Sequence, residues 1–290
     1  MNEDIVADIT GRFFLNRSDD DRPVKGRIIL TKRRFVFASS NEKETIALSK
    51  IIDINVGSVP NHVKQFFDDT VTVAYKADGS TQTAIIESKG ETVEKLVAIL
   101  FRCLLNGKKA AIQHPKRVGG RVKNTSIAIG ELRLKNQQVA VRTKSQSVSF
   151  DVANVMQIDR ANKIGDDDRI TLVVKHVDSD TGQTTTTLIA PAKGQHVNLL
   201  ARYLRLEFDE LREEIEEIQL SNPEKRLLVS IHATDGDIDF TNMLDGDAAY
   251  VTNVLNSVQR KQLVVENGTD LSLTPRGRIV VSEQIEDVNA

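Results

Sequence analysis

The sequence predicts an α+β multidomain protein in which two tandem β-barrels, each capped by a C-terminal helix, precede a winged-helix domain. Three observations predict this architecture. The apolar pattern of the N-terminal part of the chain recurs once further along. Within each copy, apolar residues alternate with the period of half-buried strands and then change to helical spacing. Residues 247–278 finally follow the order helix, strand, turn, strand and helix start.

The internal repeat becomes visible when VKGRIILTKRRFVF (24–37) is aligned with AIGELRLKNQQVAV (128–141). Gly26 then falls on Gly130, and the apolar positions continue to match without a gap as far as Ile158. Further strand-like runs and a helical segment correspond after a shorter loop. Because repeated apolar patterns commonly mark repeated structural units, we interpret the two segments as a duplicated domain.

Each copy is expected to form a small sandwich or barrel of the PH or GRAM type, although another small barrel with a capping helix is an alternative. In the first copy the helix is predicted over 91–105, and Gly107 follows as a C-terminal cap. The hairpin tip Lys32–Arg34 is a candidate lipid contact, but the second copy has 135–138 in its place and lacks the basic cluster. The fold alone does not choose between lipid and protein ligands.

We predict a first PH-like domain at 1–107, a second at 124–220, and a winged helix at 221–290. Between the barrels, residues 108–123 are predicted to form a basic linker. From Lys95 to Gly130 the chain holds eight Lys or Arg residues and no acidic residue. This segment is expected to be either a flexible linker or a surface for an acidic partner, since charge of one sign steers association. The candidate partner-binding residues are Lys108, Lys109, Lys116, Arg117, Arg121 and Lys123.

The helix that ends the second copy is predicted to be long and acidic. Its apolar residues from Leu204 to Ile218 follow alternating spacings of four and three, which is typical of a helix that packs along another surface. We expect this seam to cover the next domain and the acidic face to be solvated. The alternative is a helix that binds a partner or a second copy of the chain, with Glu207, Glu210 and Glu214 on its acidic face.

The C-terminal region is predicted to be a winged helix. Asn222 and Pro223 suit the start of its first helix, a short second helix is expected over 240–244, and Asp247 is expected to cap the third. The Asn267-Gly268 pair predicts a hairpin turn between two strands. Thr274 and Pro275 then predict the start of a last helix.

The charge of this winged helix argues against nucleic acid as its ligand. Residues 224–290 hold six basic and eleven acidic residues. DNA affinity depends mainly on cations that meet phosphates, so we expect the domain to pack against protein. The alternative partner surface therefore combines the acidic-helix residues with four residues of the third helix. These four residues are Tyr250, Asn253, Asn256 and Arg260.

No arrangement of residues predicts catalysis, a cofactor or a metal ion. The five histidines are scattered, and the single cysteine, Cys103, excludes a Cys-based zinc site. The acidic runs 19–21 and 166–168 lack the spacing of a calcium loop and are interpreted as solvated turns. The N-terminus has no signal-peptide pattern, and no apolar run is long enough to span a bilayer. A cytoplasmic protein is expected, and the lone cysteine fits a reducing compartment.

Four segments stand out when the whole arrangement is considered: KGRIILTKRRFVF, KIIDI, VEKLVAILFRCLLNGKKA and AYVTNVLNSVQRKQLV…LSLTPRGR. In these segments the chain resembles the archaeal taxis protein family CheF, and the resemblance covers nearly the full chain. It implies a non-enzymatic adaptor that links the phosphorylated response regulator CheY to the archaellum motor. It also implies recruitment from the cytoplasm to the motor at the membrane. No family contact motif transfers to individual residues, so the binding residues above are not taken from the resemblance.

Two other classes of function stay open at this point. One is a winged-helix transcriptional regulator, which the acidic third domain disfavours. The other is an adaptor for lipid surfaces that uses the Lys32–Arg34 tip. A homodimer through the long acidic helix is a further alternative for the assembly.

Overall fold

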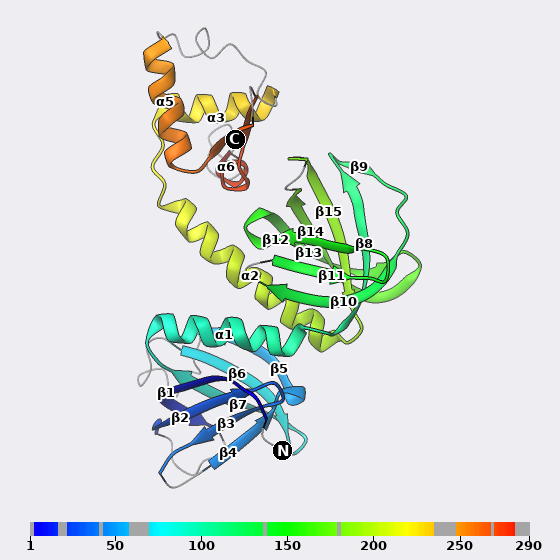
Figure 1. Ribbon diagram of the computed structural model, residues 1–290, viewed down its shortest axis with the longest axis vertical. Helices are drawn as coiled ribbons and strands as arrows, with labels where there is room; N and C mark the ends of the chain where they lie inside the picture. Colours follow the sequence, from blue (N-terminus) through cyan, green and yellow to red (C-terminus); the bar gives the residue numbers. More distant parts are fainter. Residues whose placement is uncertain are drawn as a thin grey trace.

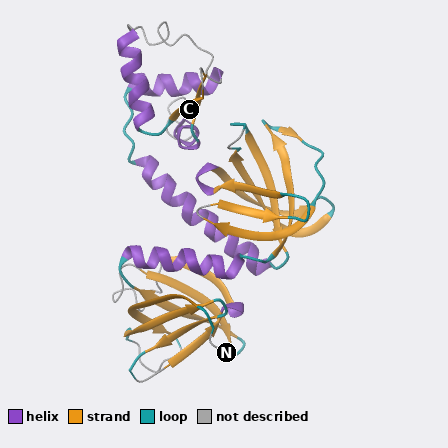
Figure 2. Cartoon of the chain, viewed as in Figure 1, coloured by secondary structure: helices purple, strands orange, loops and turns teal. Residues whose placement is uncertain are grey.

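The computed structural model describes residues 3–16, 22–40, 43–57, 70–135, 138–178, 181–234, 248–267 and 270–281. It is an elongated α+β structure of three units stacked along the long axis (Figure 1). Two units are built around large antiparallel sheets, and the third is mostly helical (Figure 2). Within the described ranges, no helix has the length and apolar character needed to cross a membrane.

The first unit is a seven-stranded antiparallel sheet in the order β4-β3-β2-β1-β7-β6-β5, followed by one helix. Large apolar side chains such as Ile28, Phe35 and Ile86 are fully buried inside it, which explains the period-two pattern. A short 3-10 turn, η1 (Leu48–Lys50), joins β4 to β5. The elements are β1 (Ile5–Leu15), β2 (Val24–Thr31), β3 (Arg34–Ala38), β4 (Lys43–Ala47), β5 (Ile51–Val56), β6 (Thr70–Ala77), β7 (Ser80–Glu87) and α1 (Gly90–Leu105).

The second unit repeats this topology. Its main strand order is β12-β11-β10-β8-β15-β14-β13, with the short β9 paired to β8. A 3-10 turn, η3 (Val152–Asn154), lies between β12 and β13, as η1 does between β4 and β5. The elements are β8 (Lys109–Val118), β9 (Arg121–Val122), β10 (Ala128–Lys135), β11 (Gln138–Arg142), β12 (Ser147–Asp151), β13 (Val155–Ile164), β14 (Asp167–Val177), β15 (Thr184–Pro191) and α2 (Gly194–Glu216).

The predicted internal repeat is confirmed, because equivalent residues occupy equivalent strands of the two sheets. The same steric restriction explains why the aligned position is glycine in both copies. A Cβ atom at Gly26 would lie within 3 Å of the carbonyl oxygen of Ala38. A Cβ atom at Gly130 would meet the carbonyl oxygen of Arg142 equally closely. Each glycine therefore permits a close approach of two neighbouring strands.

The prediction that 108–123 is a linker was wrong, because most of this segment belongs to the second sheet. Lys109–Val118 forms β8, the counterpart of β1, and pairs with both β10 and β15. Pairing begins immediately after α1: the Gly107 N–H donates to Leu132 O at 2.9 Å. Ala110, Ala111 and Ile112 are buried. The high content of lysine, arginine, proline and glycine concealed this short apolar stretch.

The described strands do not close into barrels. In each sheet the pairing path has two ends, β4 and β5 in the first and β12 and β13 in the second, and within the described ranges these ends are not paired with each other. The sheets are curled around their apolar contents, with a seam between the end strands (Figure 1). A helix follows the last strand of each sheet, α1 in the first unit and α2 in the second.

The two sheets share one hydrophobic core through α1 and α2. A continuous cluster of buried apolar side chains includes residues of both sheets and both helices. Between the helices, the rings of Phe101 and Tyr203 pack with centroids 5.5 Å apart. Burial of such aromatic surface contributes substantially to packing. The first two units are therefore joined by a hydrophobic interface.

The third unit contains α3 (Asn222–Thr234), α5 (Ala248–Arg260), the hairpin β16 (Val264–Asn267) and β17 (Asp270–Leu273), and α6 (Pro275–Val280). The last helix begins as predicted, since Thr274 Oγ1 accepts a hydrogen bond from Gly277 N. The first helix is capped one residue earlier than predicted, because Glu224 reaches back to the N–H of Ser221 in a capping box. The expected helix over 240–244, the Asp247 cap and Gly268 lie outside the described residues.

The helix α2 connects the second unit to the third, as the prediction of a seam over the next domain requires. Ile215, near its C-terminal end, is buried in the core of the third unit. Phe208 packs against the cores of both units. The apolar residues at this end of α2 are therefore covered by the third unit of the same chain.

Candidate protein-interaction surfaces

The basic segment forms a twisted ribbon at one end of the second sheet. Its outer half consists of β8 and β9, which pair Arg117 with Val122 and Val118 with Arg121. Pairing extends one step further, because Lys123 N donates to Lys116 O at 2.9 Å. Gly119 and Gly120 make the connecting turn with positive φ angles, a conformation that glycine adopts without steric cost.

The pairing sorts the cations of this ribbon onto two faces. Residues that are paired across antiparallel strands share a face, and neighbours along a strand alternate. Lys116, Arg121 and Lys123 therefore lie on the face of Val118, whereas Arg117 lies on the opposite face with Val122. Within the described ranges, none of these four cationic side chains forms a hydrogen bond or an ion pair. We call Lys116, Arg121 and Lys123 the basic face.

The other two predicted cations do not join this face. Lys109 forms an ion pair with Glu131 at 3.0 Å, and this contact lowers the pKa of that carboxyl group. Lys108 is half-buried at the junction that follows α1. Its charge lies near His196. The imidazole pKa of His196 is lowered mainly by burial and, to a smaller extent, by the positive charge of Lys108. The six residues predicted as one cluster are thus divided among three environments.

The alternative surface is also divided. Tyr250, Asn253, Asn256 and Arg260 are exposed on α5, and their spacing of three and four residues places them in one stripe. Glu207 lies on α2 and is half-buried. Glu210 and Glu214 belong to the same helix, but their side chains lie outside the described part of the structure. The α5 stripe is therefore a coherent polar surface of the third unit.

The hairpin tip between β2 and β3 is less available for anions than its sequence indicates. Lys32 pairs with Asp4 at 3.0 Å, and Arg34 pairs with Glu3 at 2.8 Å. A hydrogen bond from Thr31, burial and the arginines of the tip act on the Glu3 carboxyl, and its pKa is lowered. Arg33 is exposed and has no such partner within the described ranges. The two acidic residues that precede β1 thus neutralise two of the three cations of the tip.

The sequence did not reveal a pair of neighbouring histidines in the second sheet, of which His176 is buried and His114 half-buried. His114 Nδ1 and His176 Nε2 both lie within hydrogen-bonding distance of Thr187 Oγ1, at 2.7 and 2.9 Å. His176 also stacks on Phe150 with ring centroids 4.7 Å apart. Burial lowers the pKa of His176 to about 4, so this imidazole is neutral at pH 7. The local sequence could not predict this arrangement, because His114, His176 and Thr187 belong to three separate strands.

A second polar network ties the helices of the third unit together. Glu224 is 4% exposed and accepts hydrogen bonds from Ser221, Ser257 Oγ and Lys261 Nζ. Lys261 also donates to Gln219 O at 2.8 Å. These bonds join α3 to Ser257 of α5, to Lys261 just after α5 and to Gln219 in the segment that follows α2, so the network is structural. Among the described residues, no group of three or more His, Cys, Asp or Glu side chains is placed to hold a metal ion.

Comparisons with known proteins match this architecture to one family. The family described as Archaeal Chemotaxis signal transduction system protein F matches residues 5–210, which cover both sheets and most of α2. The chain belongs to the archaeal CheF family. Taxis protein CheF2 of Halobacterium salinarum is 34% identical to this CheF chain over 290 residues, covering 100% of both. Taxis protein CheF1 of the same organism is 23% identical over 97% of each chain.

Membership of this family places the CheF chain in archaeal chemotaxis signal transduction. A solved structure, the Spt16D Pob3N heterodimer, aligns with 61% of this chain and 86% of the other at 12% identity. Its TM-score of 0.25 is too low to support a fold assignment. The matches to the two taxis proteins extend through the third unit, so the resemblance described from the sequence holds over the full chain.

Proposed function

We propose that this CheF protein is a non-enzymatic adaptor that binds the phosphorylated response regulator CheY and links it to the archaellum motor switch. The observation that carries the proposal is the full-length match to two taxis proteins. An adaptor needs separate surfaces on a stable frame. The hydrophobic core shared by the first two units and the helix α2 are consistent with such a frame.

We further propose that the two curled sheets are PH/GRAM-like domains and that the third unit is a winged helix. The strand order common to both sheets, each followed by one helix, supports the first assignment. The order of helices, hairpin and final helix supports the second. The ranges 1–107, 108–220 and 221–290 then become the proposed domains, with the former linker assigned to the second domain.

The basic face is the surface we propose for CheY. Response regulators of this type gather acidic side chains around the phosphorylated aspartate, and phosphorylation adds further negative charge. Lys116, Arg121 and Lys123 present three cations on one side of a paired ribbon. Exposed charges of this kind act chiefly on the association rate and its salt dependence. The α5 stripe and the acidic face of α2 are then the candidate surfaces for the motor proteins.

Surface plasmon resonance with immobilised CheY, activated by beryllium fluoride, tests this assignment. The variant K116E/R121E/K123E is expected to associate about tenfold more slowly at low salt, with a flatter salt dependence. The variant K25E/K89E/K144E changes the net charge equally on exposed residues elsewhere and is expected to change the rate by less than about twofold. Equal rates for the two variants would remove the basic face from the proposal.

The other two functions receive less support from the geometry. Two of the three cations at the hairpin tip are paired with acidic residues, which disfavours a lipid surface. The third unit presents Glu266 as an exposed side chain on its hairpin, which opposes contact with a phosphate backbone. A gel-shift titration at physiological salt is expected to show no DNA complex at protein concentrations below about 1 μM.

A further inference from the structure

The two end strands of the first sheet differ in whether another part of the molecule covers them. The β5 end is covered by α2 of the second unit. Gln195 Nε2 donates a hydrogen bond to the backbone oxygen of Ile51, and Arg202 forms an ion pair with Asp53 at 3.3 Å. A helix that covers an end strand prevents pairing with other chains. At the other end, β4 borders a cavity.

The backbone of β4 directs hydrogen-bonding groups into this cavity. Leu48 N donates to Arg33 O at 2.8 Å, so these residues form a hydrogen-bonded pair. Hydrogen-bonded and non-hydrogen-bonded pairs alternate along an antiparallel ladder. Ile46 is therefore bonded to Phe35, whereas Thr45 turns its N–H and C=O groups, and Ala47 its N–H group, away from β3. The Ala47 carbonyl is used by η1, because Ala47 is the N-cap residue of that turn. The described strands place no partner beside β4 on that side.

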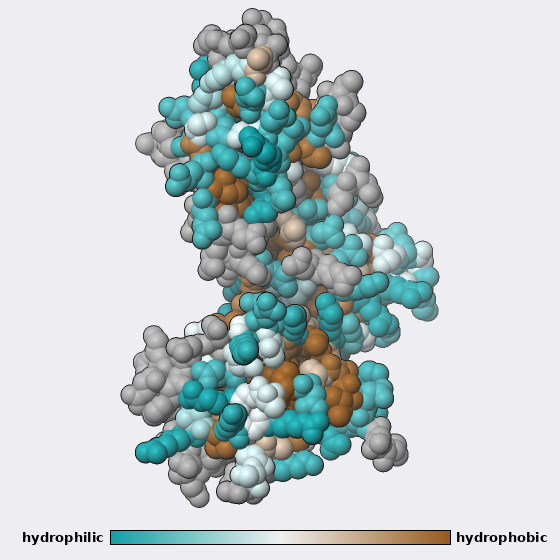
Figure 3. Space-filling view, turned by 60° about the vertical axis from the view of Figure 1, so that its left-hand side comes forward, coloured by the Kyte–Doolittle hydropathy of each residue, from teal (hydrophilic) through white to brown (hydrophobic). Residues whose placement is uncertain are grey.

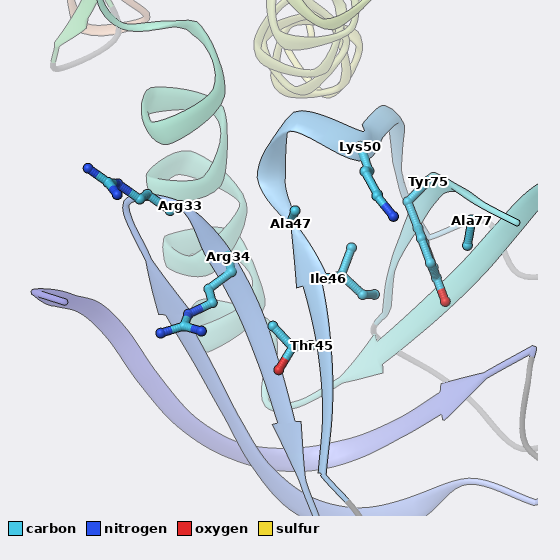
Figure 4. A pocket seen from close by; sticks show the side chains of 8 residues that line it. All are labelled: Arg33, Arg34, Thr45, Ile46, Ala47, Lys50, Tyr75 and Ala77. Carbon is cyan, nitrogen blue, oxygen red and sulfur yellow. The ribbon is translucent and has the colours of Figure 1, made fainter. Parts of the chain in front are cut away.

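The cavity has a volume of about 370 Å³ and lies between β4 and the C-terminal end of β6. Thr45 and Ala47 form one wall, and Lys50 and Tyr75 lie on the other side (Figure 4). Tyr75 is 4% exposed, and Ile46 lies at the floor. The cavity thus offers an apolar floor beside a strand edge that no other described strand pairs with, which is the arrangement that accepts an added strand.

The charges along this edge are predominantly positive. Lys43 lies at the start of β4, and Lys50 and Arg33 lie beyond its end. All three side chains are exposed, and within the described ranges none has a hydrogen-bond or ion-pair partner. Arg34, which also lines the cavity, is held by Glu3. The one acidic residue of β4, Glu44, alternates to the other side of the strand.

We propose that β4 is a docking edge for an extended acidic segment of a partner protein, which adds a strand to the first sheet. The N–H and C=O groups of Thr45 and the N–H group of Ala47 would bind the segment, and its Asp or Glu side chains would reach Lys43 and Lys50. This surface is distinct from the basic face, and the inference does not depend on CheY as partner. Figure 3 shows that the surface of the first unit carries polar and hydrophobic areas side by side.

Fluorescence polarisation with a labelled synthetic peptide of alternating Glu and Val tests the inference on the full-length protein. Thr45→Pro removes the outward N–H, and proline is tolerated on an end strand at such a position. Thr45→Val keeps the N–H and serves as the matched control. We expect T45V to bind like the wild type and T45P to bind at least about tenfold more weakly, equivalent to losing about 1.4 kcal/mol.

A second comparison uses the unchanged protein and therefore does not depend on the folding of T45P. The same peptide with alternate backbone nitrogens methylated keeps its charge but loses one hydrogen-bonding edge. It is expected to bind weakly, and the unmethylated peptide is expected to slow hydrogen exchange at Thr45 and Ala47. Equal binding of both peptides, equal affinity of T45P and T45V, or no binding at about 1 mM peptide would overturn the proposal. Self-association of the wild type that T45P abolishes would assign the edge to a second copy instead.

Discussion

Replacement of Glu224 by glutamine is the sharpest test of how the third unit is held together. Burial by itself raises the pKa of Glu224, but hydrogen bonds from Lys261, Ser221 and Ser257 outweigh it and lower the pKa from 4.5 to about 2. The ionised form is thus favoured in the folded protein. Glutamine has nearly the same shape, but it removes the negative charge and turns an amide group toward existing donors.

The magnitude follows from the shift in pKa. The difference between a pKa of 4.5 and one of about 2 corresponds to roughly 3 kcal/mol, at about 1.4 kcal/mol for each pH unit. Lys261 is 29% exposed, so water screens part of this attraction and we expect a loss of about 2 kcal/mol at pH 7. Because the folded pKa is below the unfolded one, the stabilisation is present above pH 4.5 or so. It is lost as the pH falls toward about 2.

Hydrogen exchange with mass spectrometry measures this loss in the full chain. Peptides from α3 and α5 in E224Q are expected to exchange about 30-fold faster than in the wild type at pH 7. E266Q changes an exposed carboxylate of the same unit and is expected to leave exchange unchanged. In thermal unfolding, the difference between wild type and E224Q should shrink as the pH is lowered from 7 toward 3. A protection loss no larger than that of E266Q would refute the reasoning.

Two further predictions concern the sheets. Gly130→Ala is expected to destabilise the second sheet by about 1–3 kcal/mol, because the new methyl group meets the Arg142 carbonyl. Thermal unfolding should show the decrease, and G194A, where a Cβ atom meets nothing within 4 Å, should not. His176 should show no imidazole titration in NMR spectra between pH 8 and 5, since its pKa is lowered to about 4. Because the folded pKa lies below the unfolded value of 6.5, the contribution of neutral His176 to stability is present at neutral pH and is lost as the pH falls from about 6.5 toward 4. An NMR titration midpoint near 6.5 would contradict the burial of this imidazole.

The repeat and its strands were predictable because side-chain alternation directly reflects burial. Ile28 and Leu30 in one sheet, and Leu132 and Leu134 in the other, are all at most 3% exposed. The first strand of the second copy was missed for a physical reason. Only three consecutive residues, Ala110–Ile112, are both apolar and buried in β8, and the basic residues that follow them extend beyond the core. Local composition therefore favoured a linker, whereas pairing on both sides fixes a strand.

The candidate interaction surfaces were predictable in charge but not in geometry. The six cations were grouped because they lie close together in the sequence. The alternation of side chains along β8 and β9 places Arg117 and Arg121 on opposite faces, and Lys109 forms an ion pair with Glu131. The histidine pair and the free edge of β4 gave no sequence signal, because both arise from residues brought together by sheet pairing. Helical spacing was more informative, since Tyr250, Asn253, Asn256 and Arg260 form one exposed stripe on α5.

The adaptor role is tested most directly by asking whether this CheF protein brings CheY to the motor. Purified archaellum switch proteins are immobilised, and CheY activated by beryllium fluoride is passed over them with and without the CheF protein. We expect activated CheY to be retained only when the CheF protein is present, and K116E/R121E/K123E to slow this retention. Retention of activated CheY to the same extent in its absence, or none in its presence, would contradict the account.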